Sequence, residues 1–79
     1  MSPTVHHEGP YAFRFYSADQ GEPPHIHVQR DRDSAKFWLT PVRLVGNWGF
    51  APHELRKIHR LVEANQEKLL EAWDDYFGS

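Results

Sequence analysis

The hydrophobic period of this chain changes once along its length, and the change limits the fold more than any other feature. Between residues 11 and 39, apolar and polar side chains alternate with a period of two, which is typical of half-buried strands. From residue 52 onward, apolar residues recur every three or four positions, which is typical of one face of a helix. The pattern predicts an α+β domain, with a three- to four-stranded antiparallel sheet followed by a C-terminal helical segment packed on one face.

Three segments carry the alternation, and a fourth has a weaker pattern. The expected strands are Tyr11–Ser17, His25–Arg30 and Ala35–Leu39. Pro41 then restricts the next segment to an edge strand, which we place at Val42–Val45. The segments between the strands are rich in Gly, Pro, Asp and Ser and are expected to be turns or loops: residues 18–24, 31–34 and 46–49.

The helical segment runs from Pro52 to Phe77, and Gly78 suits its end. A single helix of this length would be about 39 Å long, whereas a compact chain of this size is only about 30 Å across. We therefore expect two helices that break near Ala64, with Asn65 capping the second. The alternative is one long helix in which Asn65 is a polar residue in the seam of a dimer.

The length and composition restrict the class of protein. Seventy-nine residues fit one domain, which we place at residues 11–79, preceded by a flexible N-terminal arm over residues 1–10. The chain has no cysteine, which excludes disulfides and thiolate zinc sites. No stretch approaches the length of a membrane span and no signal peptide is evident, so we expect a cytoplasmic protein with no membrane contact.

The alternation also assigns side chains to the two faces of the sheet, because a slip of one residue would expose a strand's apolar set. The predicted core face consists of Phe13, Phe15, Ile26, Val28, Phe37 and Leu39, covered by Leu55, Ile58 and Val62. The opposite face is predicted to carry Arg14, Tyr16, His25, His27, Lys36 and Trp38, with Arg43 near its edge.

His25 and His27 are two residues apart on a predicted strand, so both imidazoles project from the same face. The pair suits acid–base chemistry near neutral pH, and we expect these two residues to be catalytic. A metal would need a third ligand, for which Asp19 or Glu22 is nearest in the sequence; we predict no metal and no cofactor. The plainer alternative is that the two histidines only order the preceding turn.

The same face is expected to bind substrate. Arg14, Arg30 and Lys36 would hold phosphate groups, and Tyr16 or Trp38 would stack on bases. Because the net charge is −2, contact with nucleic acid would depend on this local patch. The alternative is that the residues simply form the wet side of an antiparallel sheet.

Trp73 lies among several large apolar residues near the end of the helical segment. It either completes the core or forms a surface for a partner or for self-association, so a homo-oligomer through this region is one expectation.

Several short motifs together resemble the bacterial domain of unknown function 4160 family, over nearly the full length of the chain. The motifs are Glu22–Val28 (Glu-Pro-Pro-His-Ile-His-Val), Ala35–Leu39 with Pro41, Phe15–Ser17, Glu54-Leu55, and the spaced Asn65, Leu69 and Trp73. The chain departs from the family at Gln20, where a His is common, and at Ala51, where Ser or Thr often caps the first helix.

The resemblance implies a small cytoplasmic protein that is often encoded beside a member of the domain of unknown function 2442 family. That pairing looks like a type II toxin–antitoxin module, with this chain as the toxin-like component and the other protein as its antitoxin-like partner. Together with the predicted face, it suggests a metal-independent action on RNA or translation. A non-catalytic protein-binding module is the alternative function, and a metal-dependent hydrolase using His25, His27 and Asp19 is the weaker one.

Overall fold

The strands form a meander in which each one pairs with its neighbour in the sequence. The computed structural model describes residues 4–78. The sheet has the order β1-β2-β3-β4-β5, and every pairing is antiparallel. The strands are β1 (Thr4–Glu8), β2 (Tyr11–Arg14), β3 (His25–Arg30), β4 (Asp33–Leu39) and β5 (Val42–Trp48). A short 3-10 helix, η1 (Ser17–Gly21), separates β2 from β3, and α1 (Pro52–Ala64) and α2 (Gln66–Phe77) complete the fold.

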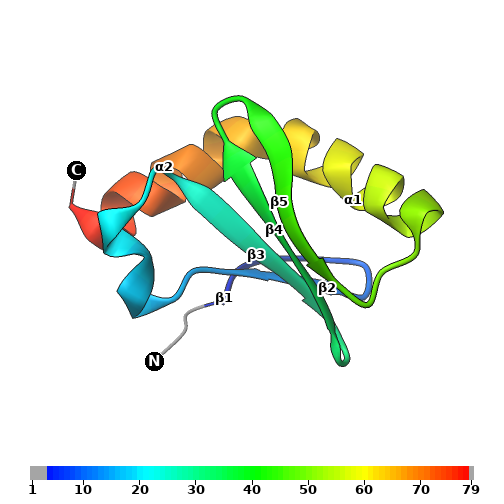
Figure 1. Ribbon diagram of the computed structural model, residues 1–79. Coiled ribbons are helices and arrows are strands. Elements are labelled where there is room, and N and C mark those ends of the chain that lie inside the picture. Colours follow the sequence, from blue (N-terminus) through cyan, green and yellow to red (C-terminus); the bar gives the residue numbers. More distant parts are fainter. Residues whose placement is uncertain (1–3, 79) are drawn as a thin grey trace.

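The two helices run along one face of the sheet, which confirms the predicted α+β class (Figure 1). The sheet has one more strand than expected, because β1 lies in the segment predicted as a flexible arm; residues 1–3 of that arm lie outside the described residues. β1 pairs with β2 through a turn at Gly9, whose φ is 58°. The ring of His6 packs on the edge of Phe13, with ring centroids 5.1 Å apart, and this contact helps to place the strand on the sheet.

β5 is also longer than expected, since Gly46, Asn47 and Trp48 belong to the strand rather than to a loop. The pairing with β4 shifts by one residue between Lys36 and Phe37, which leaves Val45 as the extra residue of a bulge. The bulge restores the pairing beyond it and lets the strand continue to Trp48.

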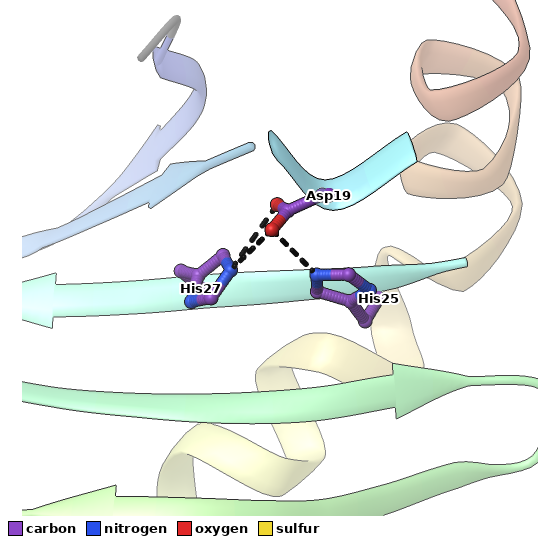
Figure 2. Close-up of side chains that lie close together, drawn as sticks. All are labelled: Asp19, His25 and His27. Atoms are coloured by element: carbon purple, nitrogen blue, oxygen red, sulfur yellow. Dashed lines mark hydrogen bonds and ion pairs between the residues drawn. The ribbon is translucent and has the colours of Figure 1, made fainter. Parts of the chain in front are cut away.

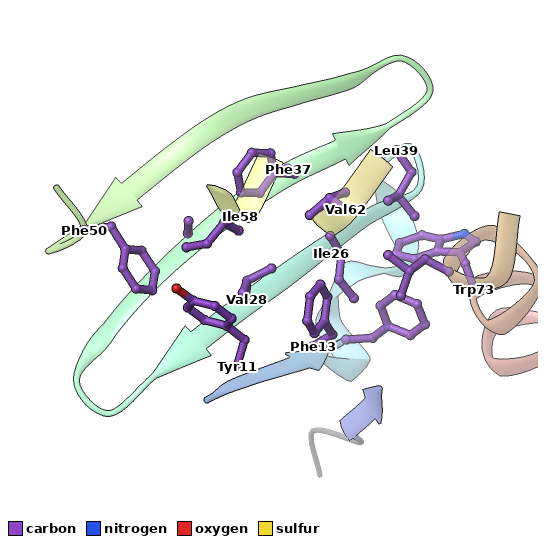
Figure 3. Packing of buried hydrophobic residues seen from close by; sticks show 13 residues of the cluster. Tyr11, Phe13, Ile26, Val28, Phe37, Leu39, Phe50, Ile58, Val62 and Trp73 are labelled. Carbon is purple, nitrogen blue, oxygen red and sulfur yellow. The ribbon is translucent and has the colours of Figure 1, made fainter. Parts of the chain in front are cut away.

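The core lies between the sheet and the helices, as the alternation predicted (Figure 3). Its fully buried side chains include the six residues of the predicted core face, Phe13, Phe15, Ile26, Val28, Phe37 and Leu39, together with Ile58 and Val62 of α1. The strand predicted over residues 11–17 ends at Arg14, so Phe15 enters the core from the segment after β2. Trp73 of α2 is 5% exposed, and its ring meets the ring of Phe15 edge to face at 5.2 Å. Tyr11 and Phe50 also belong to the core.

The two-helix interpretation is confirmed, but the predicted role of Asn65 is wrong. Asn65 separates α1 from α2 with a backbone at φ −108° and ψ 11°. Its side chain does not cap α2; the amide donates to the carbonyl of Leu61 at 2.8 Å and to Glu8 at 3.0 Å. This bond to the preceding turn competes with regular helix geometry, which accounts for a break at this residue.

The helix ends follow the sequence signals. Pro52 begins α1, and Gly78 ends α2 with a left-handed φ of 67° and an N–H that donates to the Asp74 carbonyl at 2.8 Å. Within residues 4–78, neither helix combines the length and apolar character needed to cross a membrane.

Candidate functional site

A row of three polar side chains crosses the sheet on the face opposite the helices, which we call the open face. His27 of β3 pairs directly with Arg14 of β2 on one side and with Lys36 of β4 on the other. Side chains that are directly opposite in an antiparallel sheet share one face and lie close together. The alternation predicted that these residues share a face, and the register of the strands places the imidazole between the two cations.

Asp19 of η1 joins this row to the second histidine. Its Oδ2 lies 3.2 Å from Nε2 of His27, and its Oδ1 lies 3.1 Å from Nε2 of His25. Figure 2 shows the carboxylate of η1 between the two imidazoles of β3. We call Asp19, His25 and His27 the Asp–His–His centre.

The local sequence explains how the carboxylate is held. The turn of η1 is closed by a bond from the Asp19 N–H to the Tyr16 carbonyl at 2.9 Å. The Tyr16 N–H in turn donates to Oδ2 of Asp19 at 2.8 Å. A carboxylate three residues into a helical turn commonly accepts the N–H of the residue that precedes the turn, and here this bond fixes the carboxylate over β3.

The two prolines before β3 fix the other end of the centre. Pro23 presents its carbonyl to Nδ1 of His25 at 2.9 Å. Proline has a restricted φ and keeps the residue before it extended, so the Pro23-Pro24 pair holds this carbonyl in place. Pro24 also accepts the Leu39 N–H at 3.0 Å, which extends the pairing of β3 with β4 beyond the strand. The Pro-Pro-His sequence at residues 23–25 is therefore explained by its structural role, which is to orient the ring of His25 and to extend the pairing of β3 with β4.

His25 does not face outward as the sequence predicted. Its side chain is 0% exposed, because η1 and α2 close over this end of β3. The ring of Trp73 lies 5.0 Å from its ring, and that of Trp38 lies 5.7 Å away. Strand alternation determines only the side of the sheet on which a residue projects, and it cannot show that another segment covers that side.

The hydrogen bonds of His25 determine where its proton lies. Because the Pro23 carbonyl can only accept, Nδ1 must carry the proton. Nε2 is buried and makes no hydrogen bond with any residue between 4 and 78, although Oδ1 of Asp19 is close. In the neutral ring, Nε2 therefore presents a lone pair toward a carboxylate.

His27 is more accessible, with a side chain that is 18% exposed, and it lies beside Tyr16 at 4.5 Å between ring centroids. Partial burial lowers the pKa of His27, and this effect exceeds the opposing influence of Asp19. Burial raises the pKa of Asp19, but the hydrogen bond from Tyr16 and the two imidazoles lower it more, so that pKa lies below its usual value. At neutral pH the centre thus holds a neutral His27 beside a charged carboxylate.

The predicted substrate-binding residues are divided between the two faces. Arg30 is not on the open face: it points toward α1, where it pairs with Glu54 and lies over the ring of Phe50 at 5.7 Å. Its position follows from the alternation of β3, since Arg30 has the same parity as the buried Ile26 and Val28.

On the open face, Lys36 is engaged by Glu22 at 2.6 Å and lies 5.1 Å from the ring of Trp38. The pairing with Lys36 lowers the pKa of Glu22. Tyr16 is 39% exposed, and Nε of Arg14 is buried without a hydrogen-bond partner among the described residues. Arg14, Tyr16, Lys36 and Trp38 therefore lie on the same face as His27, as the alternation predicted, but Glu22 adds a negative charge to this surface.

Asp19 is the residue whose importance the sequence understated, since we considered it only as a third metal ligand. The signal that could have identified it is its place in a turn that leads directly into the histidine strand. Chemically, the centre can take up a proton at His27, and it offers two imidazole nitrogens and a carboxylate to a cation.

Comparison with known proteins gives one match. The family model described as a domain of unknown function (DUF4160) matches residues 11–74. No curated protein and no solved structure matches the chain significantly.

Proposed function

This chain belongs to the DUF4160 family, and on that basis we propose that it is the toxin-like component of a type II toxin–antitoxin module that acts on RNA in the cytoplasm. The observation that supports this most is the cross-strand row of Arg14, His27 and Lys36 beside Asp19. The two cations can hold phosphate oxygens on either side of a proton acceptor. Tyr16 and Trp38 offer partly exposed rings on which a base can stack.

RNA cleavage at this row needs a proton acceptor and a phosphate clamp. His27 takes the proton from a 2′-hydroxyl, and the oxygen attacks the adjacent phosphorus. The bond from phosphorus to the 5′-oxygen breaks, a proton from solvent goes to that oxygen, and a cyclic phosphate remains. The carboxylate of Asp19, at 3.2 Å, stabilises the imidazolium that forms.

Growth after induction tests this function. We expect the wild-type chain to arrest bacterial growth and to degrade cellular RNA, and the His27→Ala variant to lose both effects by about a hundredfold or more. His27 is only partly buried, so the variant should remain folded, which circular dichroism would check. His53→Ala, which removes an exposed histidine of α1, is the matched control and should behave as the wild type.

If both the wild type and His27→Ala arrest growth, the activity resides on another surface. If the wild type does not arrest growth, the toxin assignment is wrong and the protein-binding module becomes the favoured function.

The outer edge of β5 is the surface that we assign to the partner protein. β5 has no strand on its outer side among residues 4–78, and it exposes Leu44, Val45 and Trp48. A strand edge with exposed apolar side chains is a template for pairing with another chain. Arg56 and Arg60 of α1 line a groove of about 360 Å³ beside Leu44, so an acidic segment of the antitoxin-like DUF2442 protein would complement this edge.

Co-expression extends the growth experiment to this surface. The DUF2442 protein should restore growth of cells that express the wild type, and it should fail to do so for a Trp48→Ser variant. Restored growth with Trp48→Ser would place the partner elsewhere.

A further inference from the structure

We propose that the Asp–His–His centre is a binding site for a divalent transition-metal ion, of which zinc is the best fit. The ligands would be a carboxylate oxygen of Asp19 and the Nε2 atoms of His25 and His27. The proposal goes beyond the function above, because it rests on the geometry of the centre and holds whatever the substrate is.

The distances match those of a metal site. In a tetrahedral zinc site with bonds of about 2.0–2.1 Å, neighbouring ligand atoms are about 3.3 Å apart. Oδ1 of Asp19 lies 3.1 Å from Nε2 of His25 and 3.4 Å from Nε2 of His27. All three ligand atoms lie within 4.8 Å of one another. An ion therefore fits with small movements of the side chains.

The unpartnered Nε2 of His25 is the observation that points most directly to a cation. The side chain is 0% exposed, and the proton on Nδ1 leaves Nε2 with a lone pair that faces Oδ1 of Asp19. In the neutral ring, Nε2 and Oδ1 of Asp19 are two acceptors 3.1 Å apart in a largely buried position, and they repel each other. A metal ion between them turns both into ligands and removes that cost. The competing explanation is a second proton on His25, which would form an ion pair with Asp19.

The surroundings of the ligands are those that metal sites use. A histidine ligand usually donates its other N–H to a carbonyl or carboxylate, which fixes the orientation of the ring. His25 does so with Pro23, and the Asp19 carboxylate is held by the Tyr16 N–H at 2.8 Å. These bonds orient the ring of His25 and the carboxylate of Asp19, so the ligands are preorganised.

The ligand set also selects the kind of ion. Two imidazoles and one carboxylate favour zinc and its neighbours, whereas magnesium prefers oxygen ligands alone. Three protein ligands leave a fourth position for water, as in catalytic rather than structural zinc sites. If the proposed function also holds, a hydroxide on the ion would accept the 2′-hydroxyl proton in place of His27.

Titration of the untagged chain tests the site. After dialysis against a chelator, calorimetry with Zn²⁺ should show one ion per chain, and Mg²⁺ should give no signal at the same concentration. Zinc at a hundredfold excess over its dissociation constant should raise the melting temperature by about 10–20 °C. Co²⁺ at the site should give the visible absorption of a tetrahedral complex.

Variants assign the ligands. Asp19→Asn keeps an acceptor for the Tyr16 N–H but removes the charge, and His25→Asn keeps a donor for the Pro23 carbonyl but removes Nε2. These variants and His27→Ala should each weaken zinc binding by at least about tenfold. Glu22→Gln, which changes a neighbouring carboxylate, should bind as the wild type does. The double variant His6→Ala/His7→Ala should also be unchanged, which excludes an adventitious surface site.

Three results would overturn the proposal: no zinc binding by the wild type, binding that Asp19→Asn and His27→Ala leave intact, or binding lost in the His6→Ala/His7→Ala variant. If His25→Asn fails to fold, Asp19→Asn and His27→Ala still decide the outcome. The experiments can disprove the metal site and the RNA activity independently of each other. Zinc binding without RNA degradation removes only the proposed function, whereas RNA degradation that a chelator does not affect, by a chain that binds no zinc, removes only the metal site.

Discussion

At the scale of single residues, Tyr11 shows how one buried hydroxyl connects the sheet to the first helix. Its OH donates to Oε2 of Glu54 in α1 at 2.7 Å, although the ring lies within the core. Arg30 of β3 pairs with the same carboxylate. Two strands and a helix are therefore joined at one partly buried acid, on the opposite side of the sheet from the Asp–His–His centre.

This contact makes the stability of the protein depend on pH in the alkaline range. Burial raises the pKa of Tyr11 above its usual 10.0, and the bond to Glu54 raises it further. Because the folded state holds this proton more tightly than the unfolded state, the contribution is complete below pH 10 and is lost as the pH rises through the folded pKa. The pH titration of tyrosinate absorbance at about 295 nm should be compared between the wild type and Tyr11→Phe. The difference between the two curves should show that Tyr11 ionises above pH 10.

The same variant tests the bond at neutral pH. Tyr11→Phe should lower the free energy of unfolding by about 1–2 kcal/mol, since Glu54 loses a donor in a partly buried position. The difference between the two proteins should shrink above pH 10, as measured by urea unfolding. A difference that grows with pH would contradict the assigned direction of the pKa shift.

The residues of the site show what a sequence can and cannot reveal. The alternation correctly put His27, Arg14 and Lys36 on one face, because the side of a strand follows from its period, but it did not show that His27 lies between the two cations. It could not show that His25 is enclosed, since the enclosure depends on how η1 and α2 meet in space. Arg30 was misplaced because its charge was given more weight than its parity on the strand.

At the scale of elements, the start of α1 lacks a capping side chain. Ala51 occupies the N-cap with an extended backbone, at φ −73° and ψ 156°, which suits a capping residue. The side chain of Glu54 is already engaged by Tyr11 and Arg30. The helix therefore depends on Pro52 and on packing for its N-terminus.

Replacement of this residue should stabilise the protein. Ala51→Ser places a hydroxyl where it can accept an N–H of the first turn, and we expect the free energy of unfolding to rise by about 0.5–1 kcal/mol. Ala64→Ser, at an exposed position at the other end of α1, is the control and should be neutral or slightly destabilising. Equal effects of the two substitutions in thermal unfolding would show that capping is not the cause.

The strands and helices differ in how well they could be predicted from the sequence. The three central strands and the two helices were predictable because their apolar residues repeat strictly. β1 was not, since it has few apolar side chains and is held partly by His6 against Phe13. The extension of β5 depends on a bulge at Val45, and a bulge has no signature in the period of a strand.

At the scale of the whole molecule, Trp73 connects the core of the sheet, the second helix and the Asp–His–His centre. Its ring packs against Phe15, which follows β2, against Phe77 of its own helix and against His25 of the centre. Being 5% exposed, it is part of the interior of the single chain. The expected self-association through this region remains a prediction, but it would have to use neighbouring side chains such as Tyr76, which is 41% exposed.

Substitution of Trp73 and of Trp48 should distinguish a core tryptophan from a surface one by its effect on stability. Trp73→Ala should lower the free energy of unfolding by about 3–5 kcal/mol, because it leaves a large cavity. That is a large part of the roughly 4–12 kcal/mol expected for a chain of this length. Trp48→Ala removes a side chain that is 59% exposed and should change stability by less than about 1 kcal/mol. Similar losses in chemical denaturation would mean that Trp48 is also structural.

The meander leaves the pairing of the sheet independent of the helices. Every strand pairs with its neighbour in the sequence, whereas part of the enclosure of His25 comes from Trp73 of α2, the last helix of the chain. Proteins open locally in cooperative units, and a docked helix can detach while a sheet stays intact. Loosening of α2 would therefore admit water to the imidazole of His25 without breaking a strand pair, so His25 stays buried only as long as α2 remains docked.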